Sequence, residues 1–522
     1  MTVTASTELQ QPGDCYALDI LSALTDTPDR VAVHWRGREI RAGELARSVA
    51  DTVRTLRRRG IGPGNTVGIL VTPNSPEMLT VRYATHLLGG AVTYVRGTNP
   101  GSTVPVLSTD AQLRILFDSS AAVLYTDTEN SGRAKELADR APGRFAVVEA
   151  EAPMTVTEPG DVRESLGELP APDPRGRALI SFSSGSTGQP KGVCVSTRVW
   201  EGTVRGTAPL VGEPSPRLLV ATPLSFVVGP MADAVLRLGG LVVLHEQFDA
   251  TQVMRAVAEH RITRTFMATP HLYQSLEVVK AEGTDLSSLR ALVYTGVAAA
   301  PAQLEEAARV FGPVLLQAYG SAEAGRISIL LPEDHDVARL RSSAGRPFPE
   351  VEIKICDQVS GEELPLGETG ELWVRSPNLM DGYLADPATT ARVLRDGWYL
   401  TGDIGRVDEQ GYISLVDRVA DVIKTDGVKI YPAVVEREIG SLPGVANAAV
   451  YGVRDSHNLE HVHAAVVPKP GARLSADTIR THVGARLSPV HAPERIRFLP
   501  ELPLGVSGKP DKQRLRLLDQ AG

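Results

Sequence analysis

Short apolar runs typical of β-strands alternate with helical patterns from about residue 30 to residue 320. The apolar run 66–71 is followed by a helical pattern over 76–88 and then by a second apolar run over 91–95. Strand–helix alternation is typical of parallel strands joined by crossover helices, so this part of the chain is expected to form parallel sheets covered by helices.

The pattern changes after about residue 350, where short strand-like segments are linked by Gly/Asp turns up to residue 416. After Asp417 a strand–helix–strand pattern continues for roughly a hundred residues, which is the size of a small separate domain. At 522 residues, the chain also exceeds what one hydrophobic core usually holds. We therefore predict an α/β protein with a large N-terminal domain, 1–416, of helix-covered parallel sheets plus a β-rich subdomain. A small mobile α+β domain, 417–522, is expected to follow.

Composition excludes several classes of function. Hydrophobic residues make up 42% of the chain and charged residues 22%, as in ordinary soluble enzymes. The formal charge of −8 opposes non-specific binding to nucleic acid, which needs a basic surface. The basic run 57–59 ends an amphipathic stretch, so we interpret it as a helix C-terminus.

Three widely spaced cysteines, Cys15, Cys194 and Cys356, match no metal-ligand spacing and form no disulfide framework. The N-terminus lacks a secretory signal pattern, and no apolar run approaches the roughly 18–20 residues of a membrane span. These features predict a cytoplasmic protein without a membrane span.

A segment rich in glycine and hydroxyl residues, 181–192, follows the strand-like run 178–182 and reads Ser-Phe-Ser-Ser-Gly-Ser-Thr-Gly-Gln-Pro-Lys-Gly. Its backbone N–H and hydroxyl groups can donate to phosphate oxygens, and Lys191 adds a positive charge. It is not a Walker loop, because Gln-Pro separates the lysine from the preceding glycine and no Ser or Thr follows. The alternative is a flexible linker, which the preceding strand and the matching motifs downstream disfavour. The predicted phosphate-binding residues are Ser183, Ser184, Gly185, Ser186, Thr187, Gly188 and Lys191.

Seven further segments occur in the order found in one family. They are Thr295-Gly-Val-Ala298, Gln317-Ala-Tyr-Gly-Ser-Ala-Glu323, Gly370-Glu-Leu-Trp-Val374, Asp381-Gly-Tyr383, Trp398-Tyr-Leu-Thr-Gly-Asp403, Asp417-Arg418 with Lys424, and Pro503-Leu-Gly-Val-Ser-Gly-Lys509. With the phosphate loop, they make the chain resemble the adenylate-forming superfamily over nearly its whole length. That superfamily includes acyl-CoA synthetases, peptide-synthetase adenylation domains and luciferases.

The resemblance implies an ATP-dependent carboxylic-acid ligase that forms an acyl-adenylate and pyrophosphate and then transfers the acyl group to an acceptor. Tyr319 should stack on adenine, Asp403 should accept from the ribose hydroxyls, and Arg418 should donate to ribose or phosphate. Glu323 resembles the ligand of an Mg²⁺ ion bound with ATP. Lys509 should lie between the substrate carboxylate and the α-phosphate, where it would neutralise the approach of two anions.

Lys509, Glu323 and Lys191 are therefore the expected catalytic residues. The rest of the implied ATP-binding set consists of Thr295, Gly296, Gln317, Ala318, Gly320, Ser321, Ala322 and Lys424. Because Lys509 must approach the phosphates and then leave, the small domain is expected to rotate on a hinge near residues 418–421. Related enzymes usually carry Asp or Lys at the hinge position, which here is Ala420.

Three positions depart from the family pattern, and two of them bear on the acceptor. Ala322 stands where the family usually has Thr, a loss of about 1 kcal/mol for one neutral hydrogen bond. Ala420 replaces the polar hinge residue, and Asp426 occupies a position often held by Lys or Gly in CoA ligases, although Lys429 could offset its charge. The last two positions, Ala420 and Asp426, belong to the part of the chain that the family uses in its thioester-forming conformation.

An amine acceptor, as in some relatives in antibiotic biosynthesis, is therefore narrowly favoured. Aminolysis of the adenylate needs mainly positioning of a neutral amine. Lys424, Gly427 and the abundance of that class favour an acyl-CoA synthetase instead, with CoA as acceptor. A loader of a separate carrier protein and a non-enzymatic ATP-binding protein are further alternatives. Among His457, His461 and His463 the sequence selects no general base, and packing is the favoured interpretation of all three.

The segment Pro223–Val228 bears on the acid. Peptide-synthetase adenylation domains carry an aspartate there that anchors the α-amino group, and Val227 stands in its place. An ammonium group would be left unpaired in an apolar site, so the acid is not expected to be an amino acid. The predicted wall suits an aromatic, alicyclic or medium-chain acid and consists of Phe226, Val227, Gly229, Val297 and Ala318.

Overall fold

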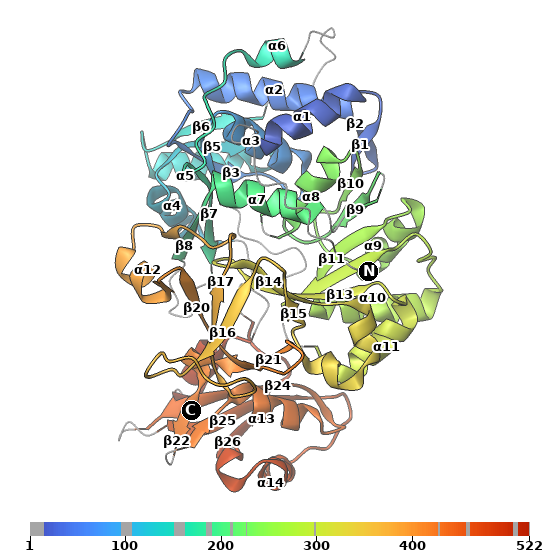
Figure 1. The fold of residues 1–522 in the computed structure, drawn as a ribbon, viewed down its shortest axis with the longest axis vertical. Coiled ribbons are helices and arrows are strands. Elements are labelled where there is room, and N and C mark those ends of the chain that lie inside the picture. Colours follow the sequence, from blue (N-terminus) through green and yellow to red (C-terminus); the bar gives the residue numbers. More distant parts are fainter. Residues whose placement is uncertain are drawn as a thin grey trace.

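The computed structural model describes residues 15–95, 107–150, 162–183, 191–208, 212–213, 215–225, 227–296, 299–425, 428–455, 460–504 and 510–520. Figure 1 shows the N-terminal elements at the top of the view and the C-terminal elements at the bottom.

The first sheet has seven strands in the order β18-β8-β7-β4-β3-β5-β6. Strands β3 to β7 pair in parallel, β8 runs antiparallel to β7, and β18 runs antiparallel to β8. The central strand β3 is buried along its whole length, as parallel strands covered on both faces are. The strands are β3 (Thr66–Leu70), β4 (Ala91–Tyr94), β5 (Ala121–Thr126), β6 (Ala146–Glu149), β7 (Arg177–Ser183), β8 (Lys191–Ser196) and β18 (Gly382–Tyr383).

The second sheet has nine strands in the order β15-β14-β13-β12-β11-β9-β10-β1-β2. Strands β13 to β1 along this order pair in parallel, and the two edges are antiparallel. The strands are β1 (Val31–Trp35), β2 (Arg38–Arg41), β9 (Arg217–Val220), β10 (Leu241–Leu244), β11 (Arg264–Ala268), β12 (Ala291–Thr295), β13 (Leu315–Ser321), β14 (Gly325–Leu330) and β15 (Arg346–Pro347).

Helices pack on both sheets, and one core cluster joins α1, α2, α3 and α8 to strands of both. In α2 the apolar positions Leu45, Val49, Val53 and Leu56 are buried, so the amphipathic pattern faces this core. The helix ends at Arg58, which confirms the basic run as a helix C-terminus. The helices are α1 (Tyr16–Asp26), α2 (Ala42–Arg58), α3 (Pro76–Leu87), α4 (Thr109–Asp118), α5 (Ser131–Arg140), α6 (Val162–Leu166), α7 (Thr197–Thr207), α8 (Val228–Arg237), α9 (Ala250–Glu259), α10 (Thr269–Glu282) and α11 (Pro301–Phe311).

The third sheet forms the β-rich part and is antiparallel throughout, with the order β16-β17-β20-β19 and β21 paired to β20. Its elements are β16 (Glu352–Cys356), β17 (Gly370–Arg375), α12 (Pro387–Val393), β19 (Leu394–Arg395), β20 (Trp398–Val407) and β21 (Ile413–Arg418). In Figure 1 this sheet lies between the upper sheets and the C-terminal elements.

The C-terminal elements surround cores of their own, one of which runs from Ile423 to Val483. A hairpin precedes a three-stranded sheet in the order β24-β25-β26, on which helices pack. The elements are β22 (Ile423–Thr425), β23 (Val428–Ile430), α13 (Pro432–Gly440), β24 (Val445–Arg454), β25 (Glu460–Pro468), α14 (Ala476–Arg486), β26 (Arg495–Phe498) and α15 (Lys512–Gln520).

This architecture confirms the predicted class, a large N-terminal domain of helix-covered parallel sheets followed by a smaller C-terminal domain. All three cysteines are free and buried. Among the described residues, no helix combines the length and apolar character needed to cross a membrane.

Candidate active site

Three of the predicted nucleotide-binding residues meet at the β-rich sheet. The Tyr319 hydroxyl donates a hydrogen bond to Asp403 Oδ2 over 2.5 Å, and Arg418 Nε lies 2.9 Å from Asp403 Oδ1. Asp403 is 8% exposed, whereas the Arg418 side chain is half exposed. Each carboxylate oxygen therefore has one protein partner and keeps a second acceptor site.

Strand pairing and a short relay of hydrogen bonds fix this carboxylate. Asp403 and Arg418 are register partners across the β20–β21 pair. The Asp403 amide donates to the Thr401 hydroxyl over 2.9 Å, and that hydroxyl donates to the Leu372 carbonyl over 2.8 Å. Glu371 accepts from the neighbouring Gly402 amide over 3.2 Å. The backbone around Asp403 is thus held independently of any ligand.

Charge and burial shift the pKa values of Tyr319 and Arg418. Burial and the Asp403 carboxylate raise the pKa of the Tyr319 phenol well above its usual value, so the phenol stays a donor. The same carboxylate raises the pKa of Arg418, so the guanidinium keeps its charge. The cluster presents a buried, negatively charged acceptor beside an aromatic ring and a half-exposed cation.

Strand β13 carries Tyr319 and is held to β12 by side chains of the predicted set. The Thr295 hydroxyl donates to the Ala318 carbonyl over 2.7 Å, and the Tyr294 hydroxyl donates to Gln317 Oε1 over 3.1 Å. Gly296, which follows β12, has a φ of +112°, a backbone conformation that favours glycine. These contacts align the carboxyl ends of two parallel strands, where ligands of such sheets usually bind.

A tight turn between β13 and β14 carries Glu323. A β-carbon at Gly320 would lie 2.2 Å from the Gly325 carbonyl oxygen, so the strands approach too closely for any side chain there. The Ser321 hydroxyl accepts from the Ala324 amide over 3.1 Å and closes the turn. Ala322 is exposed at its tip, and Glu323 is half-buried.

Lys191 and Glu323 come from different sheets and contact the same side chain. Lys191 is the first residue of β8, and its Nζ lies 5.2 Å from the centre of the Tyr383 ring. The Tyr383 hydroxyl donates to Glu323 Oε1 over 3.0 Å. Tyr383 thus contacts the Lys191 ammonium with its ring and the Glu323 carboxylate with its hydroxyl.

The residues present fit a magnesium ion that arrives with a nucleotide. Within the described part of the chain, no three His, Cys, Asp or Glu side chains gather as a complete metal cage. Mg²⁺ is commonly held by one or two carboxylates together with phosphates and waters, and the Glu323 carboxylate keeps acceptor sites beyond its bond to Tyr383.

Several predicted residues fall outside the described part of the chain. They are the loop residues Ser184, Gly185, Ser186, Thr187 and Gly188, the acid-wall residues Phe226 and Val297, His457, Asp426, Gly427 and Lys509. Ser183, Ala420, Lys424 and Lys429 lie within described backbone, but their side chains do not belong to the described part.

The described members of the predicted acid wall differ in their surroundings. Val227 precedes α8 and is 58% exposed, and Ala318 is half-buried on β13. At Gly229 a β-carbon would lie 2.5 Å from the Leu224 carbonyl oxygen. The missing side chain at 229 therefore permits close packing of α8 on the preceding segment.

Sequence reasoning missed a buried ion pair that anchors this segment. Arg82 of α3 contacts Asp233 of α8, and both side chains are fully buried. Tyr83 donates to the same aspartate over 2.6 Å, and Arg82 Nη1 donates to Tyr94 Oη and, at 3.5 Å, to the Leu224 carbonyl. Burial opposes the charge on Arg82, but Asp233 and the neighbouring tyrosine hydroxyls together outweigh it, so the pKa of Arg82 lies well above its usual value.

A second missed residue holds the same segment from the other side. Asn74 is fully buried at a φ of +51°. Its side-chain oxygen accepts from the Leu224 backbone N–H over 3.0 Å, and its side-chain nitrogen donates to the Thr222 and His245 carbonyls. A charged residue in each of two apolar helices and an Asn-Ser-Pro turn were the available sequence signals.

Two of the three histidines considered as a general base lie in the described part of the chain, and both have structural partners. His463 Nδ1 lies 2.7 Å from Asp519 of α15, and the same carboxylate accepts from Tyr451 over 2.9 Å. His461 lies within 3.1 Å of both Asp455 and Glu494. These contacts agree with the interpretation of both residues as packing.

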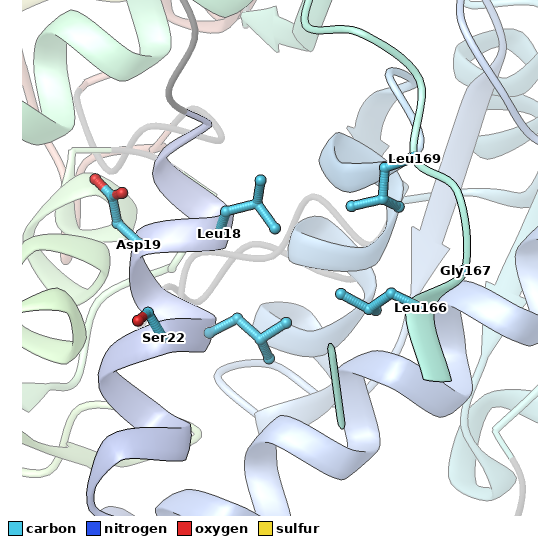
Figure 2. A pocket seen from close by; sticks show the side chains of 7 residues that line it. Leu18, Asp19, Ser22, Leu166, Gly167 and Leu169 are labelled. Carbon is cyan, nitrogen blue, oxygen red and sulfur yellow. The ribbon is translucent and has the colours of Figure 1, made fainter. Parts of the chain in front are cut away.

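Two depressions of the described surface lie elsewhere. One of about 340 Å³ lies between α1 and the segment after α6, where Figure 2 shows Leu18, Leu166 and Leu169 pointing toward one another. A second, of about 280 Å³, borders Gly312 and His335 behind β13. Neither is lined by Lys191, Glu323 or Asp403.

Comparison with known proteins identifies the family. The protein-family model described as AMP-binding enzyme matches residues 22–384, and the family model described as AMP-binding enzyme C-terminal domain matches residues 434–509. The chain is 35% identical to a feruloyl-CoA synthase from Amycolatopsis sp over 496 residues, which cover 94% of this chain and 96% of the relative.

Two solved structures share the fold along the whole chain. The amide bond synthetase McbA from Marinactinospora thermotolerans has a TM-score of 0.84 and 34% identity, with 96% of this chain and 99% of that chain covered. The o-succinylbenzoate coenzyme A synthetase MenE from Bacillus subtilis, solved in complex with ATP and magnesium ion, has a TM-score of 0.80 and 27% identity, with 95% and 99% covered. The chain therefore belongs to the AMP-binding enzyme family and is an AMP-forming acid ligase.

Proposed function

We propose that this ligase activates a small carboxylic acid with ATP and transfers the acyl group to an amine, forming an amide. In the first step a carboxylate oxygen attacks the α-phosphorus of ATP, and pyrophosphate leaves. In the second step the amine nitrogen attacks the acyl carbon, the bond to AMP breaks, and the nitrogen loses a proton. The second step is the part that distinguishes this proposal from thioester formation.

The cluster of Tyr319, Asp403 and Arg418 supports a nucleoside subsite. A ribose hydroxyl can donate to the free acceptor sites of Asp403, while the Tyr319 ring offers a surface for adenine. Arg418 can swing between Asp403 and a phosphate because its side chain is half exposed.

Lys191 and Glu323 supply opposite charges for the phosphates. The Lys191 ammonium stabilises phosphate oxygens as the α-phosphorus is attacked, and Lys509 neutralises the approaching carboxylate and phosphate. A bound Mg²⁺ would reduce the repulsion between the phosphates, with Glu323 as its protein ligand. Rotation of the C-terminal domain, proposed as 417–522, about Ala420 would remove Lys509 before the second step.

The acid is proposed to be aromatic, alicyclic or medium-chain rather than an amino acid. Val227 has no charge to pair with an ammonium group, and the single carboxylate of α8, Asp233, is buried and paired with Arg82. An ammonium group in this segment would lose its water without gaining a partner, at a cost of several kcal/mol. The proposed wall consists of Phe226, Val227, Gly229, Val297 and Ala318.

The single observation that favours an amine is the similarity to an amide bond synthetase along the whole chain, at 34% identity. Ala420 and Asp426, which depart from the family pattern at positions of the thioester-forming conformation, agree with it. The second candidate function is an acyl-CoA synthetase, favoured by the 35% identity to a feruloyl-CoA synthase. A carrier-protein acceptor is a third alternative.

Product masses distinguish these acceptors. With ATP, Mg²⁺ and an acid panel, we expect an amide product whose rate saturates with amine concentration, because a bound amine is positioned by the protein. Amine added after the enzyme has been removed serves as the control for reaction in solution. Acyl-CoA formation in the presence of CoA, with no amide from any amine, would show that the amine proposal is wrong.

A further inference from the structure

The motif Asp381-Gly-Tyr383 has no role in the proposed reaction, yet its tyrosine contacts both charged residues proposed for the phosphates. The ring of Tyr383 lies under Lys191 Nζ at 5.2 Å, and its hydroxyl donates to Glu323 Oε1 over 3.0 Å. We propose that Tyr383 is a positioning residue that aims Lys191 and Glu323 at the same phosphate groups. This inference rests on the proposed ATP site.

The backbone of Tyr383 is fixed relative to Lys191 by strand pairing. Tyr383 is the register partner of Val193 in the β18–β8 pair, two residues after Lys191. The Leu384 amide donates to the Gly192 carbonyl over 2.7 Å. The ring therefore lies beside the start of β8, and it can hold the Lys191 ammonium by a cation–π contact.

A second set of bonds fixes the other side of Tyr383. Its amide donates to the Thr390 hydroxyl over 2.9 Å. At Gly382, with φ +145°, a β-carbon would lie 2.8 Å from Thr390 Cγ2, so only glycine fits in this turn. The tyrosine is thus held between β8 and α12 before any nucleotide binds.

Glu323 reaches Tyr383 from the turn after β13, which belongs to the other large sheet. The Met380 amide donates to the Glu323 carbonyl over 2.7 Å, so the segment before β18 also holds the backbone of the turn. The phenol then engages one carboxylate oxygen and leaves the other acceptor sites for a metal ion. Burial, followed by the negative charge of Glu323, raises the pKa of Tyr383, which keeps its O–H a donor.

The two contacts are chemically separable, which makes the inference testable. Tyr383→Phe removes the hydroxyl but keeps the ring under Lys191. Tyr383→Leu removes both contacts. A Tyr412→Phe variant is the matched control. The Tyr412 hydroxyl also donates to a carboxylate, Asp334, over 2.6 Å, and neither residue belongs to the proposed ATP site.

The measurement is the dissociation constant of ATP by calorimetry without acid, in Mg²⁺ and in EDTA. For Tyr383→Phe we expect ATP affinity in EDTA to stay within about twofold of the wild type, whereas the gain in affinity on adding Mg²⁺ falls by about 3- to 10-fold. For Tyr383→Leu the affinity in EDTA should also fall by about 2- to 5-fold, because Lys191 loses its ring. Tyr412→Phe should change neither quantity.

Two results would overturn the inference. Either Tyr383→Phe binds ATP with the wild-type gain from Mg²⁺, or it loses the same affinity in Mg²⁺ and in EDTA, as a merely structural role predicts. Lys191→Ala and Glu323→Gln separate this failure from that of the ATP site. If those two variants weaken ATP binding in Mg²⁺ while Tyr383→Phe does not, only the role of Tyr383 is wrong. If neither weakens it, the proposed phosphate subsite is wrong as well.

Discussion

Replacing Arg82 with methionine is expected to lower the free energy of unfolding by about 3–5 kcal/mol, because it leaves Asp233 as an unpaired charge in the core. The guanidinium also holds the Tyr94 hydroxyl and the Leu224 carbonyl. Urea denaturation measures the loss. Because Leu224 precedes the proposed acid wall, the KM for the acid should rise more than the KM for ATP.

The charge on Asp233 makes the explanation testable. In the double variant Arg82→Met/Asp233→Asn, the new amide side chain at position 233 can still accept from Tyr83 but carries no charge. Its free energy of unfolding should therefore be at least about 1–2 kcal/mol higher than that of Arg82→Met alone. Arg36→Met is the matched control, since Arg36 pairs with Glu129 and Glu246 on the surface, where an ion pair is worth about 0–1 kcal/mol. A cost for Arg82→Met no larger than that control would contradict a structural ion pair.

The second large effect is expected for Asp403→Ala. The value of kcat/KM for ATP in acid-dependent pyrophosphate exchange should fall by about 10²-fold, mainly through KM. Hydrogen bonds to a charged acceptor are worth about 1.5–3 kcal/mol each, and the alanine variant also frees Tyr319 and Arg418 from their common partner. Glu352→Ala removes an exposed carboxylate of the same sheet, paired with Arg375, and should change the exchange rate little.

A fall caused by unfolding is distinguished by the melting temperature. Asp403→Ala should melt near the wild type, because hydrogen bonds between the Thr401 and Glu371 side chains and backbone groups hold β20 without the Asp403 carboxylate. An Asp403→Ala enzyme that is folded and exchanges pyrophosphate at the wild-type rate would remove Asp403 from the nucleotide site.

The alternation of apolar runs and helical patterns was enough to predict the fold class, because parallel strands buried on both faces read as continuous apolar segments. The order of the strands was beyond such reasoning. Strand β4 pairs with β7 across more than eighty residues, and the two-residue strand β18 joins β8 from the far end of the N-terminal domain. These pairings depend on tertiary packing rather than on local pattern.

For the site, the order of motifs placed Tyr319, Asp403 and Arg418 in one set, and the structure brings these three side chains together. Their roles stay predictions. Arg82 and Asp233 can be recognised in the sequence as charged residues in apolar helices. That they pair with each other could not be predicted, because the contact depends on how α3 packs against α8. The close approach of Gly229 to the Leu224 carbonyl was not predictable either, because it depends on how α8 packs on the preceding segment.

The most direct test of the account is a crystal structure of the chain with a non-hydrolysable ATP analogue and Mg²⁺. The account predicts adenine on Tyr319, ribose hydroxyls within hydrogen-bond distance of Asp403, and phosphates between Lys191 and Glu323. A triphosphate bound elsewhere, with Asp403 contacting only Tyr319 and Arg418, would contradict it.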